Sequence, residues 1–298
     1  MVADSGTGFP AVAGYNTRSY WVQTRAHWDS GGPEALVQLA CALHSNGHNV
    51  SIYPTKIAPH FKSEYPCISL LPQRSVELAR AGDVVIGPND HPCPAGSDAR
   101  LFVWLLSNLS PPQRSPPCIP LAHNMWLARR HGAPLIRPYI TPSVAAYCAT
   151  VLRLRRHSRD LILLDSDVPP HVARSVAKRF PNTSLLVSGF SRGAVRALLP
   201  RAAHVVDWSF VGSERLPIEA VLCGANLITS SDRRNCALES DFGPLPRSSI
   251  VDSVPALLSA LSAPLPPLRA LAPMRAAFGG DALNASTLYA DLQIAGVV

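Results

Sequence analysis

The sequence predicts an α/β protein made of two domains, each with a mainly parallel β-sheet covered by helices. Short runs of apolar and β-branched residues alternate with segments of helical periodicity along the chain. Several of these runs are apolar throughout, which is typical of parallel strands buried on both faces. Hydrophobic residues make up 47% of the 298-residue chain and charged residues 16%, so the chain can bury a substantial core and does not have the composition of a disordered protein.

The first half opens with a strand, a loop that contains glycines, a helix and a second strand. Residues 19–24 alternate and carry aromatic and β-branched side chains, which predicts the first strand. Pro33 takes a favoured position at the start of the helix, and Glu34 suits the positive helix start. Gly47 ends this helix, and residues 50–53 form the second predicted strand. This order is the opening of a doubly wound α/β domain.

The same alternation continues to the end of the chain. In the first half, further strands are predicted at residues 83–87 and 101–106, and a helix near residues 124–130. Residues 146–160 are predicted to link the two halves, because they carry an arginine-rich run and a new β-α pattern follows them. In the second half, strands are predicted at residues 161–164, 185–187, 204–208 and 226–229, and helices at 172–180, 194–199, 217–223 and 254–261.

The C-terminal part contains a Pro-rich stretch at residues 264–273 and then a helix with Ala285, Leu288 and Leu292 on its apolar face. We expect this helix to pack back across the first domain. The predicted division of the chain is therefore a first domain at residues 1–148, a second domain at 149–270 and a returning C-terminal helix at 271–298.

The stretch that predicts a ligand site runs from Asp207 to Asp232. It contains the end of a strand, a loop with Gly212, Ser213 and Glu214, and the start of a helix near Pro217. A helix start offers unpaired N–H groups and a partial positive charge, and ligands of open parallel sheets bind at the carboxyl ends of strands. The sequence therefore predicts an anion-binding site in this loop.

Two charged side chains in this stretch are candidates for ligand contacts. Arg215 has the bidentate geometry that suits a phosphate group, and the carboxylate of Glu219 can accept hydrogen bonds from sugar or ribose hydroxyls. The alternative is that Glu219 only interacts favourably with the helix dipole and that Arg215 pairs with Glu214 at the surface.

The segment GSERLPIEAVLCGANLITS, residues 212–230, resembles the donor-binding stretch of retaining GT-B glycosyltransferases of the family 4 type. It is most similar to a branch found in bacterial capsule and surface-polysaccharide clusters and in some algae and viruses. The resemblance spans roughly residues 19–250, and further motifs that carry it are Gly31-Gly32-Pro33-Glu34-Ala35-Leu36, Gly47-His48, the strand at 99–107 and Asp241-Phe-Gly-Pro-Leu-Pro246.

The resemblance implies two Rossmann-like domains that face each other across a cleft. In the family, the glutamate that corresponds to Glu219 holds the nucleotide ribose, and Arg215 matches an arginine at the donor phosphates. Gly31 and Gly32 match a loop that faces the donor, where the lack of a side chain lets a ligand approach the backbone. The candidate catalytic residues are thus Arg215 and Glu219, and the donor-binding set is Gly31, Gly32, Asp207, Gly212, Ser213, Glu214, Arg215, Pro217 and Glu219.

The chain departs from the family pattern in two places. Val211 stands where the family motif has its first glutamate. The basic pair that follows the first strand of the second domain is replaced by a segment that begins with Asp165. We therefore expect the donor pyrophosphate to depend on Arg215, with Arg192 or Arg137 as alternatives, and on helix N–H groups.

The acceptor side is assigned to the first domain. His27 and Trp28 lie on the loop before the first helix, and His123 and Asn124 lie at a junction between a strand and a helix. The alternative is that these histidines have no role in a site. The histidines show neither HxH nor HExxH spacing, so no metal site is predicted, and Asp165 with Asp167 is expected to end a strand.

The predicted function is transfer of a sugar from a nucleoside-diphosphate sugar to a glycan or another hydroxyl acceptor. The resemblance implies retention of configuration, no metal and no cofactor, with the nucleotide-sugar as co-substrate. The alternatives are a non-catalytic nucleotide- or sugar-binding protein of the same shape, and a basic nucleic-acid-binding module.

Charge and cysteine content bear on partners and location. The net charge of +7 attracts phosphate-bearing partners, but the basic run Arg153–Arg159 has no interleaved aromatic residues, so no nucleic-acid partner is expected. Peripheral contact with an anionic membrane is an alternative use of this run. The seven dispersed cysteines predict reduced thiols rather than disulfides. Because neither a signal peptide nor an apolar span is evident, a cytoplasmic location is expected.

Overall fold

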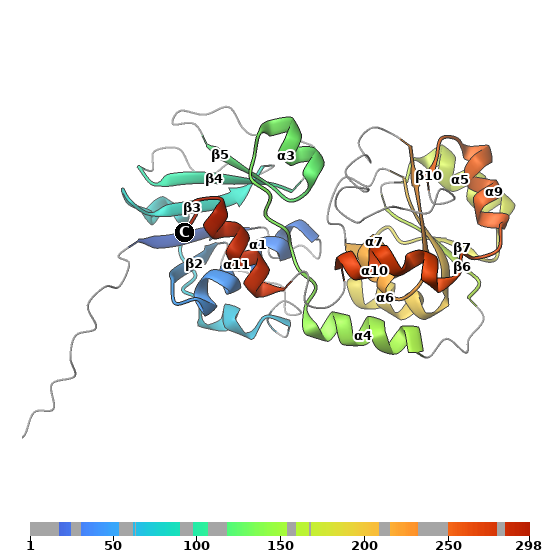
Figure 1. Cartoon of the computed structure of the whole chain (residues 1–298), viewed down its shortest axis with the longest axis horizontal. Coiled ribbons are helices and arrows are strands. Elements are labelled where there is room, and N and C mark those ends of the chain that lie inside the picture. The colour runs from blue at the N-terminus through green and yellow to red at the C-terminus, as the bar shows by residue number, and fades with distance from the viewer. Residues whose placement is uncertain are drawn as a thin grey trace, which may run out of the picture.

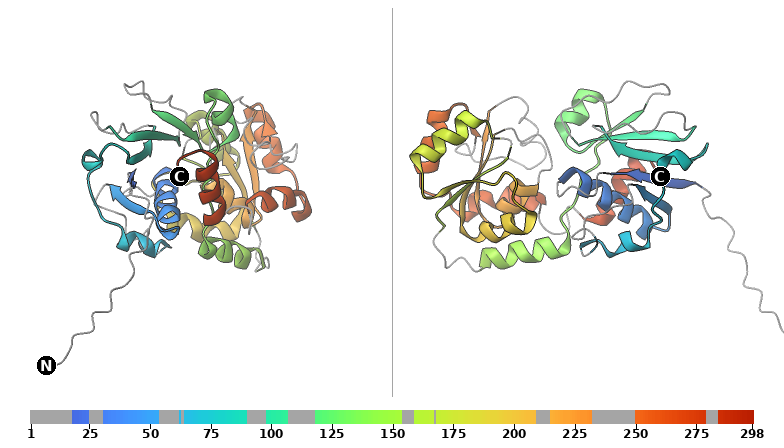
Figure 2. Two further views of the ribbon diagram at one scale, coloured as in Figure 1. Left: turned by 60° about the vertical axis from the view of Figure 1, so that its left-hand side comes forward. Right: turned by 180° about the vertical axis from the view of Figure 1, so that it is seen from behind.

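The computed structural model of the protein consists of two α/β domains that lie side by side, each built on its own five-stranded parallel sheet (Figures 1 and 2). The predicted fold class is thereby confirmed. The structure describes residues 18–24, 31–53, 62, 64–89, 98–106, 118–153, 159–166, 168–208, 215–231, 250–278 and 284–298.

The sheet of the first domain has the strand order β2-β1-β3-β4-β5. Its strands are almost wholly buried, because helices cover the apolar runs that the sequence shows. Helix α1 (Gly31–Ser45) begins at Gly31, before the predicted start at Pro33, and packs on β1 and β2. The other elements of this domain are β1 (Ser19–Gln23), β2 (Asn49–Tyr53), η1 (Pro66–Leu70), η2 (Val76–Leu78), β3 (Val84–Pro88), β4 (Arg100–Leu105), β5 (Ile119–Ala122) and α3 (Met125–His131).

The sheet of the second domain has the order β10-β9-β8-β6-β7. Counted from the first strand of each domain, the two sheets therefore have the same strand order. All its elements up to β9 match predicted ones within a few residues, whereas β10 was not predicted. These elements are β6 (Leu161–Leu164), α5 (Pro170–Arg179), β7 (Ser184–Leu186), α6 (Arg192–Leu198), η3 (Leu199–Arg201), β8 (Ala202–Asp207), α7 (Arg215–Leu222), β9 (Asn226–Ser230), β10 (Ile250–Val251) and α9 (Val254–Ser262).

The connection between the domains differs from the predicted link at residues 146–160. Helix α4 (Pro142–Arg153) occupies much of that range and runs from the boundary between the domains along the lower side of the second domain in Figure 1. Ile136 belongs to the core of the first domain, whereas Val144 and Cys148 of α4 belong to a core of the second. The chain therefore leaves the first core before α4, and the predicted boundary at residue 148 lies inside a helix of the second core.

The C-terminal segment is shared between the two domains. Helix α10 (Ala272–Phe278), which follows η6 (Leu268–Leu271), packs against α7 of the second domain. Helix α11 (Ala285–Ile294) packs against α1, and its Leu288 and Leu292 are fully buried in the core of the first domain. The predicted returning segment at 271–298 thus begins on the second domain and ends on the first.

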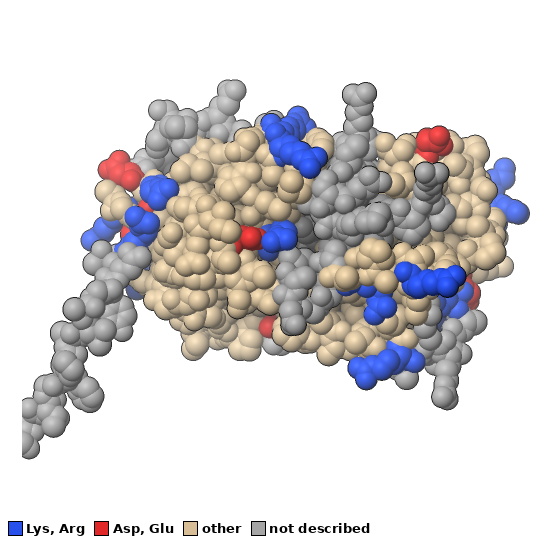
Figure 3. Space-filling view, viewed as in Figure 1, with Lys and Arg blue, Asp and Glu red and all other residues tan. Residues whose placement is uncertain are grey.

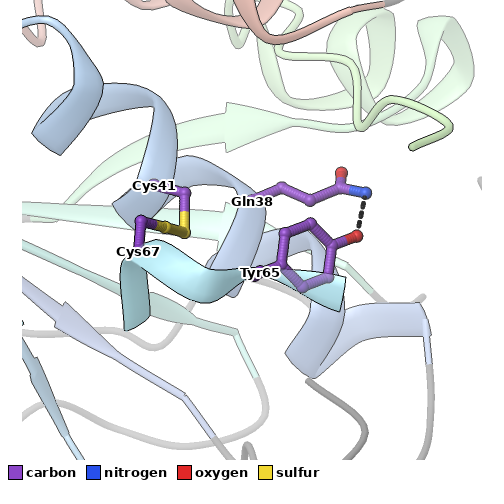
Figure 4. The surroundings of a disulfide bond; sticks show 4 residues. All are labelled: Gln38, Cys41, Tyr65 and Cys67. Carbon is purple, nitrogen blue, oxygen red and sulfur yellow. Dashed lines mark hydrogen bonds between the residues drawn. A yellow bond between two sulfur atoms is a disulfide. The ribbon is translucent and has the colours of Figure 1, made fainter. Parts of the chain in front are cut away.

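A disulfide bond joins Cys41 of α1 to Cys67 of η1 (Figure 4), so the expectation of reduced thiols was wrong for this pair. Among the described cysteines, Cys118, Cys148 and Cys223 lie outside this bond. The spacing of the cysteines carried no signal for this pair, because connectivity depends on the fold. Disulfide bonds are rare in reducing compartments, so this bond weighs against the expected cytoplasmic location.

Replacing Cys41 and Cys67 together with alanine is expected to lower the free energy of unfolding by about 3 kcal/mol, because the bond closes a loop with a sequence separation of 26 residues and so restricts the unfolded chain. Urea unfolding of the oxidised protein and of the double variant measures this difference. Cys118→Ala, which removes a cysteine outside this bond, serves as the control. Equal unfolding midpoints for the oxidised protein and the double variant would contradict the expected contribution.

Candidate functional site between the domains

The carboxyl ends of the two sheets each lead into a helix that reaches the domain boundary. In parallel sheets with this strand order, ligands bind at the carboxyl ends of two adjacent strands whose following connections run to opposite sides. These strands are β1 and β3 in the first domain and β6 and β8 in the second. Helix α1 follows β1 in the first domain, and α7 follows β8 in the second. The site is therefore built from the first turns of two helices that belong to different domains.

Five charged side chains connect these helix starts, and we call them the interdomain cluster. The first domain contributes two carboxylates and the second domain contributes two guanidinium groups and one carboxylate. The cluster consists of Glu34, Glu64, Arg192, Arg196 and Glu219.

Within the second domain, Arg196 of α6 holds Glu219 of α7 by two hydrogen bonds. Its Nε donates to Oε2 and its Nη2 donates to Oε1, each at 3.0 Å. The side chain of Glu219 is 5% exposed, so the pair is largely removed from water. Tyr147 of α4 donates its hydroxyl to the carbonyl of Arg196 and fixes the helix end on which this arginine lies.

Among the described residues, three ion pairs cross from one domain to the other. The Nη2 atom of Arg192 lies 3.0 Å from Oε1 of Glu34 and 3.3 Å from Oε2 of Glu64. The Nη1 atom of Arg196 lies 3.0 Å from Oε1 of Glu64. Arg192 also lies 3.9 Å from Oε1 of Glu219 and thereby connects the first turn of α1 with α7.

The first-domain side of the cluster is held by uncharged groups. Tyr65 donates its hydroxyl to Glu34, and Gln38 donates to the Tyr65 hydroxyl at 2.9 Å (Figure 4). The side chain of Gln38 also makes two hydrogen bonds with the backbone of Tyr139. The Tyr139 N–H donates to Oε1 of Gln38 at 2.9 Å, and Nε2 of Gln38 donates to the Tyr139 carbonyl at 2.6 Å. Tyr139 lies in the segment that leads to α4, so Gln38 ties α1 to the interdomain connection.

Burial and pairing act in opposite directions on the cluster. Burial, together with the neighbouring Arg196, lowers the pKa of Arg192, although Glu64 and Glu219 oppose this effect. Burial also disfavours the charged form of Arg196, but its hydrogen bonds to Glu219 and Glu64 outweigh burial and raise its pKa. Burial is the main reason that the pKa of Tyr65 is raised, so this phenol stays a hydrogen-bond donor. The arginines remain charged at neutral pH.

The predicted donor-binding residues fall into four groups, the last of which lies outside the described residues. Glu219 lies in the interdomain cluster. Asp207 ends β8 as a fully buried residue opposite Thr229 of β9, and Pro217 is buried in the first turn of α7. Gly31 and Gly32 form the start of α1, and Arg215 is the first residue of α7, although its side chain lies outside the described part of the structure. His27, Trp28, Gly212, Ser213 and Glu214 also lie outside the described residues.

The two described acceptor-side candidates, His123 and Asn124, make hydrogen bonds to residues of the first domain. Asn124 caps α3 by accepting the N–H of Leu127 at 2.8 Å, and its amide lies 3.2 Å from Nε2 of His123. The other ring nitrogen of His123 hydrogen-bonds the carbonyl of Leu105. Burial lowers the pKa of His123 to about 4, so its ring is neutral at physiological pH. These contacts position the end of β5, and an acceptor role for either residue stays a prediction.

The two arginines that were alternatives for binding the donor pyrophosphate, Arg192 and Arg137, lie in different environments. Arg192 lies in the interdomain cluster, whereas Arg137 pairs with Asp291 of α11 at 3.4 Å on an exposed surface. Asp165 directly follows β6 and accepts hydrogen bonds from Ser166, as expected for a residue that ends a strand.

Arg196 and Glu64 belong to the cluster but were not singled out from the sequence. One signal was present only in part: Arg192 and Arg196 are four residues apart, a spacing at which two like charges on one helix repel each other unless acidic partners are close, but the predicted helix began at residue 194 whereas α6 begins at Arg192. Glu64 gave no comparable signal, because its partners come from the other domain.

The described residues contain neither a candidate metal site nor a membrane-spanning helix. In this part of the chain, no group of three or more His, Cys, Asp or Glu side chains is placed to hold a metal ion. None of the described helices combines the length and the apolar character that crossing a membrane requires. On the face shown in Figure 3, the described Lys and Arg side chains lie in separate small groups and form no continuous basic surface.

Two facing Rossmann-like domains of this kind define the GT-B fold. Solved structures that share it include AviGT4, a glycosyltransferase involved in avilamycin A biosynthesis, with a TM-score of 0.54 and 13% identity over 94% of this chain and 97% of that one. WaaG, a glycosyltransferase involved in lipopolysaccharide biosynthesis, gives a TM-score of 0.54 and 13% identity over 93% and 99% of the two chains. No protein-family model and no curated protein matches the sequence.

Proposed function

We propose that this protein is a glycosyltransferase that moves a sugar from a nucleoside-diphosphate sugar to a hydroxyl group of a glycan or another acceptor. The observation that carries the proposal is the position of Glu219. It lies in the first turns of α7, beyond the carboxyl end of β8, and is connected to the first turn of α1 through Arg192. A carboxylate at this place can accept hydrogen bonds from the ribose of a nucleotide bound between the domains.

The start of α7 would serve the phosphate groups of the donor. Cleavage of the bond between sugar and phosphate leaves negative charge on the diphosphate, and Arg215 with the N–H groups of the helix start would stabilise that charge. Closure of the domains would exclude water, which would otherwise hydrolyse the donor. We propose that transfer retains the configuration of the sugar and needs no metal.

A non-catalytic nucleotide- or sugar-binding protein is the second candidate. The observation that favours it is Val211, which stands where the family motif has its first glutamate. Such a protein would bind a nucleotide-sugar without breaking it. The two candidates therefore differ in turnover and not in binding.

A thermal-shift screen of UDP-, GDP-, dTDP- and CMP-sugars tests the proposal first, because a ligand that binds only the native state raises its melting temperature. The nucleotide-sugar that binds is then incubated with and without hydroxyl acceptors, and with a chelator. Release of nucleoside diphosphate that persists with the chelator is expected. Binding without any release would favour the second candidate, and a screen without any shift would contradict both.

Gly32→Ala tests an effect on donor binding that is independent of an effect on stability. A Cβ atom at Gly32 would meet only Leu106 side-chain atoms, at 3.8 and 3.9 Å, which is ordinary contact. Alanine also favours a helix by about 0.5–1 kcal/mol over glycine, so the melting temperature should stay equal or rise. If the donor approaches this backbone, the added methyl group is expected to weaken its binding by roughly tenfold.

Calorimetry and thermal unfolding of Gly32→Ala measure these two quantities. A matched control is Gly193→Ala in α6, where a Cβ atom would also meet no close atom. Donor affinity that is the same in both variants and in the original protein would remove Gly32 from the donor site.

A further inference from the structure

We propose that Arg196 is a positioning residue, which holds the carboxylate of Glu219 in the orientation that receives the ribose, and that Glu64 makes this arrangement depend on contact between the domains. The ligand in this inference rests on the proposed function. The geometry rests on contacts among described residues alone.

The guanidinium of Arg196 is divided between two carboxylates of different domains. Nε and Nη2 form a fork on Glu219, and Nη1 donates to Glu64, all at 3.0 Å. A fork fixes the plane of a carboxylate as well as its position. The carboxylate of Glu219 therefore cannot rotate about its terminal bond without breaking both hydrogen bonds.

The fork leaves Glu219 able to bind a ligand. A carboxylate offers about four acceptor positions on its two oxygens, and the fork of Arg196 takes one on each. In the proposed complex, the ribose hydroxyls would bind at positions on this carboxylate other than the two that the fork takes. Lysine would keep the positive charge but would bind as a single point, so it would not fix the plane of the carboxylate.

Glu64 brings the first domain into this arrangement. It binds Nη1 of Arg196 and Nη2 of Arg192, and it precedes Tyr65, whose hydroxyl is held by Gln38 of α1. The disulfide of Cys67 fixes the same segment to α1 a few residues later (Figure 4). When the domains separate, Arg196 loses its third contact and its guanidinium gains freedom to move, so Glu219 is fully oriented only in the closed arrangement.

The positioning role is tested by a mutant cycle on donor affinity. Calorimetry with UDP-glucose and GDP-mannose is carried out on the original protein, R196K, E219Q and the double variant R196K/E219Q. We expect R196K to weaken binding by about tenfold, and we expect the double variant to equal E219Q within about twofold, since both changes act through one carboxylate. Effects of the two changes that multiply would overturn the positioning role.

The control is R201K. Arg201 also grips a carboxylate with two nitrogen atoms, that of Asp160, but this pair is exposed and lies outside the cluster. We expect R201K to bind the donor as the original protein does. A loss of affinity in R201K that equals the loss in R196K would show a general effect of arginine replacement and overturn the assignment.

The role of Glu64 is tested without any donor. Small-angle X-ray scattering compares the original protein, E64Q and R201K, and a larger maximum dimension is expected for E64Q alone, because it weakens two of the three ion pairs between the domains. Unchanged scattering of E64Q would overturn the coupling role. An original protein that binds none of the UDP-, GDP-, dTDP- and CMP-sugars of the thermal-shift screen would instead overturn the proposed function together with the ribose role. The scattering would still test whether Glu64 couples the domains.

Discussion

Glu219→Ala is expected to weaken binding of the nucleotide-sugar by about 100-fold, the largest effect of any single replacement in the site. The change removes a buried carboxylate that would accept two hydroxyl hydrogen bonds, and bonds to a charged group contribute about 1.5–3 kcal/mol each before losses elsewhere. It also leaves Arg196 with only Glu64 as a partner from the cluster. The loss of the ribose hydrogen bonds and the loss of a partner for Arg196 both arise at the first turns of α7.

Calorimetry with the best ligand of the screen measures this loss, and circular dichroism verifies that the variant is folded. Glu77→Ala is the matched control, because Glu77 is an exposed carboxylate on η2, outside the cluster. An affinity of Glu219→Ala within twofold of the original protein would remove Glu219 from the donor site and leave the interdomain cluster as a structural feature only.

Arg196→Met is expected to lower the free energy of unfolding by about 3 kcal/mol. Methionine fills much of the volume of the arginine stem but removes the guanidinium that pairs with Glu64 and Glu219. Removing one partner of a buried ion pair is costly, because the other charge keeps its desolvation penalty. For a chain of this size we expect the melting temperature to fall by several degrees.

Arg201→Met is the matched control for stability. Its side chain is 56% exposed and its partner Asp160 is also exposed, so loss of this pair should cost less than about 1 kcal/mol. Thermal unfolding followed by circular dichroism compares the two variants. Equal melting temperatures for Arg196→Met and Arg201→Met would show that the interdomain cluster contributes no more than a surface pair.

Much of the fold could be predicted because parallel strands leave a direct record in the sequence. Most residues of β3, β4, β6 and β8 are apolar, since these strands are largely buried on both faces. Gly224 ends α7 with a positive φ of 85°. Helix α4 was missed although Val144, Cys148 and Val151 have helical spacing. The arginines that follow them dominated the prediction of a linking segment.

Only those residues of the candidate site that lie close together in the sequence could be predicted. The loop and first turn of α7, with Arg215 and Glu219, lie within one short segment and could be recognised from its motif. The partner of Glu219 lies 23 residues earlier, and Arg196 and Glu64 are 132 residues apart. Such pairs, like the Cys41–Cys67 bond, are created by the packing of α1, η1, α6 and α7, which periodicity and spacing do not encode.

A crystal structure of the protein with its nucleotide-sugar tests the central claim most directly. The account predicts that the nucleotide lies between the start of α1 and the start of α7, with ribose hydroxyls within hydrogen-bond distance of Glu219 and with Arg196 still gripping that carboxylate. A nucleotide bound on one domain alone, away from Glu219, would contradict it.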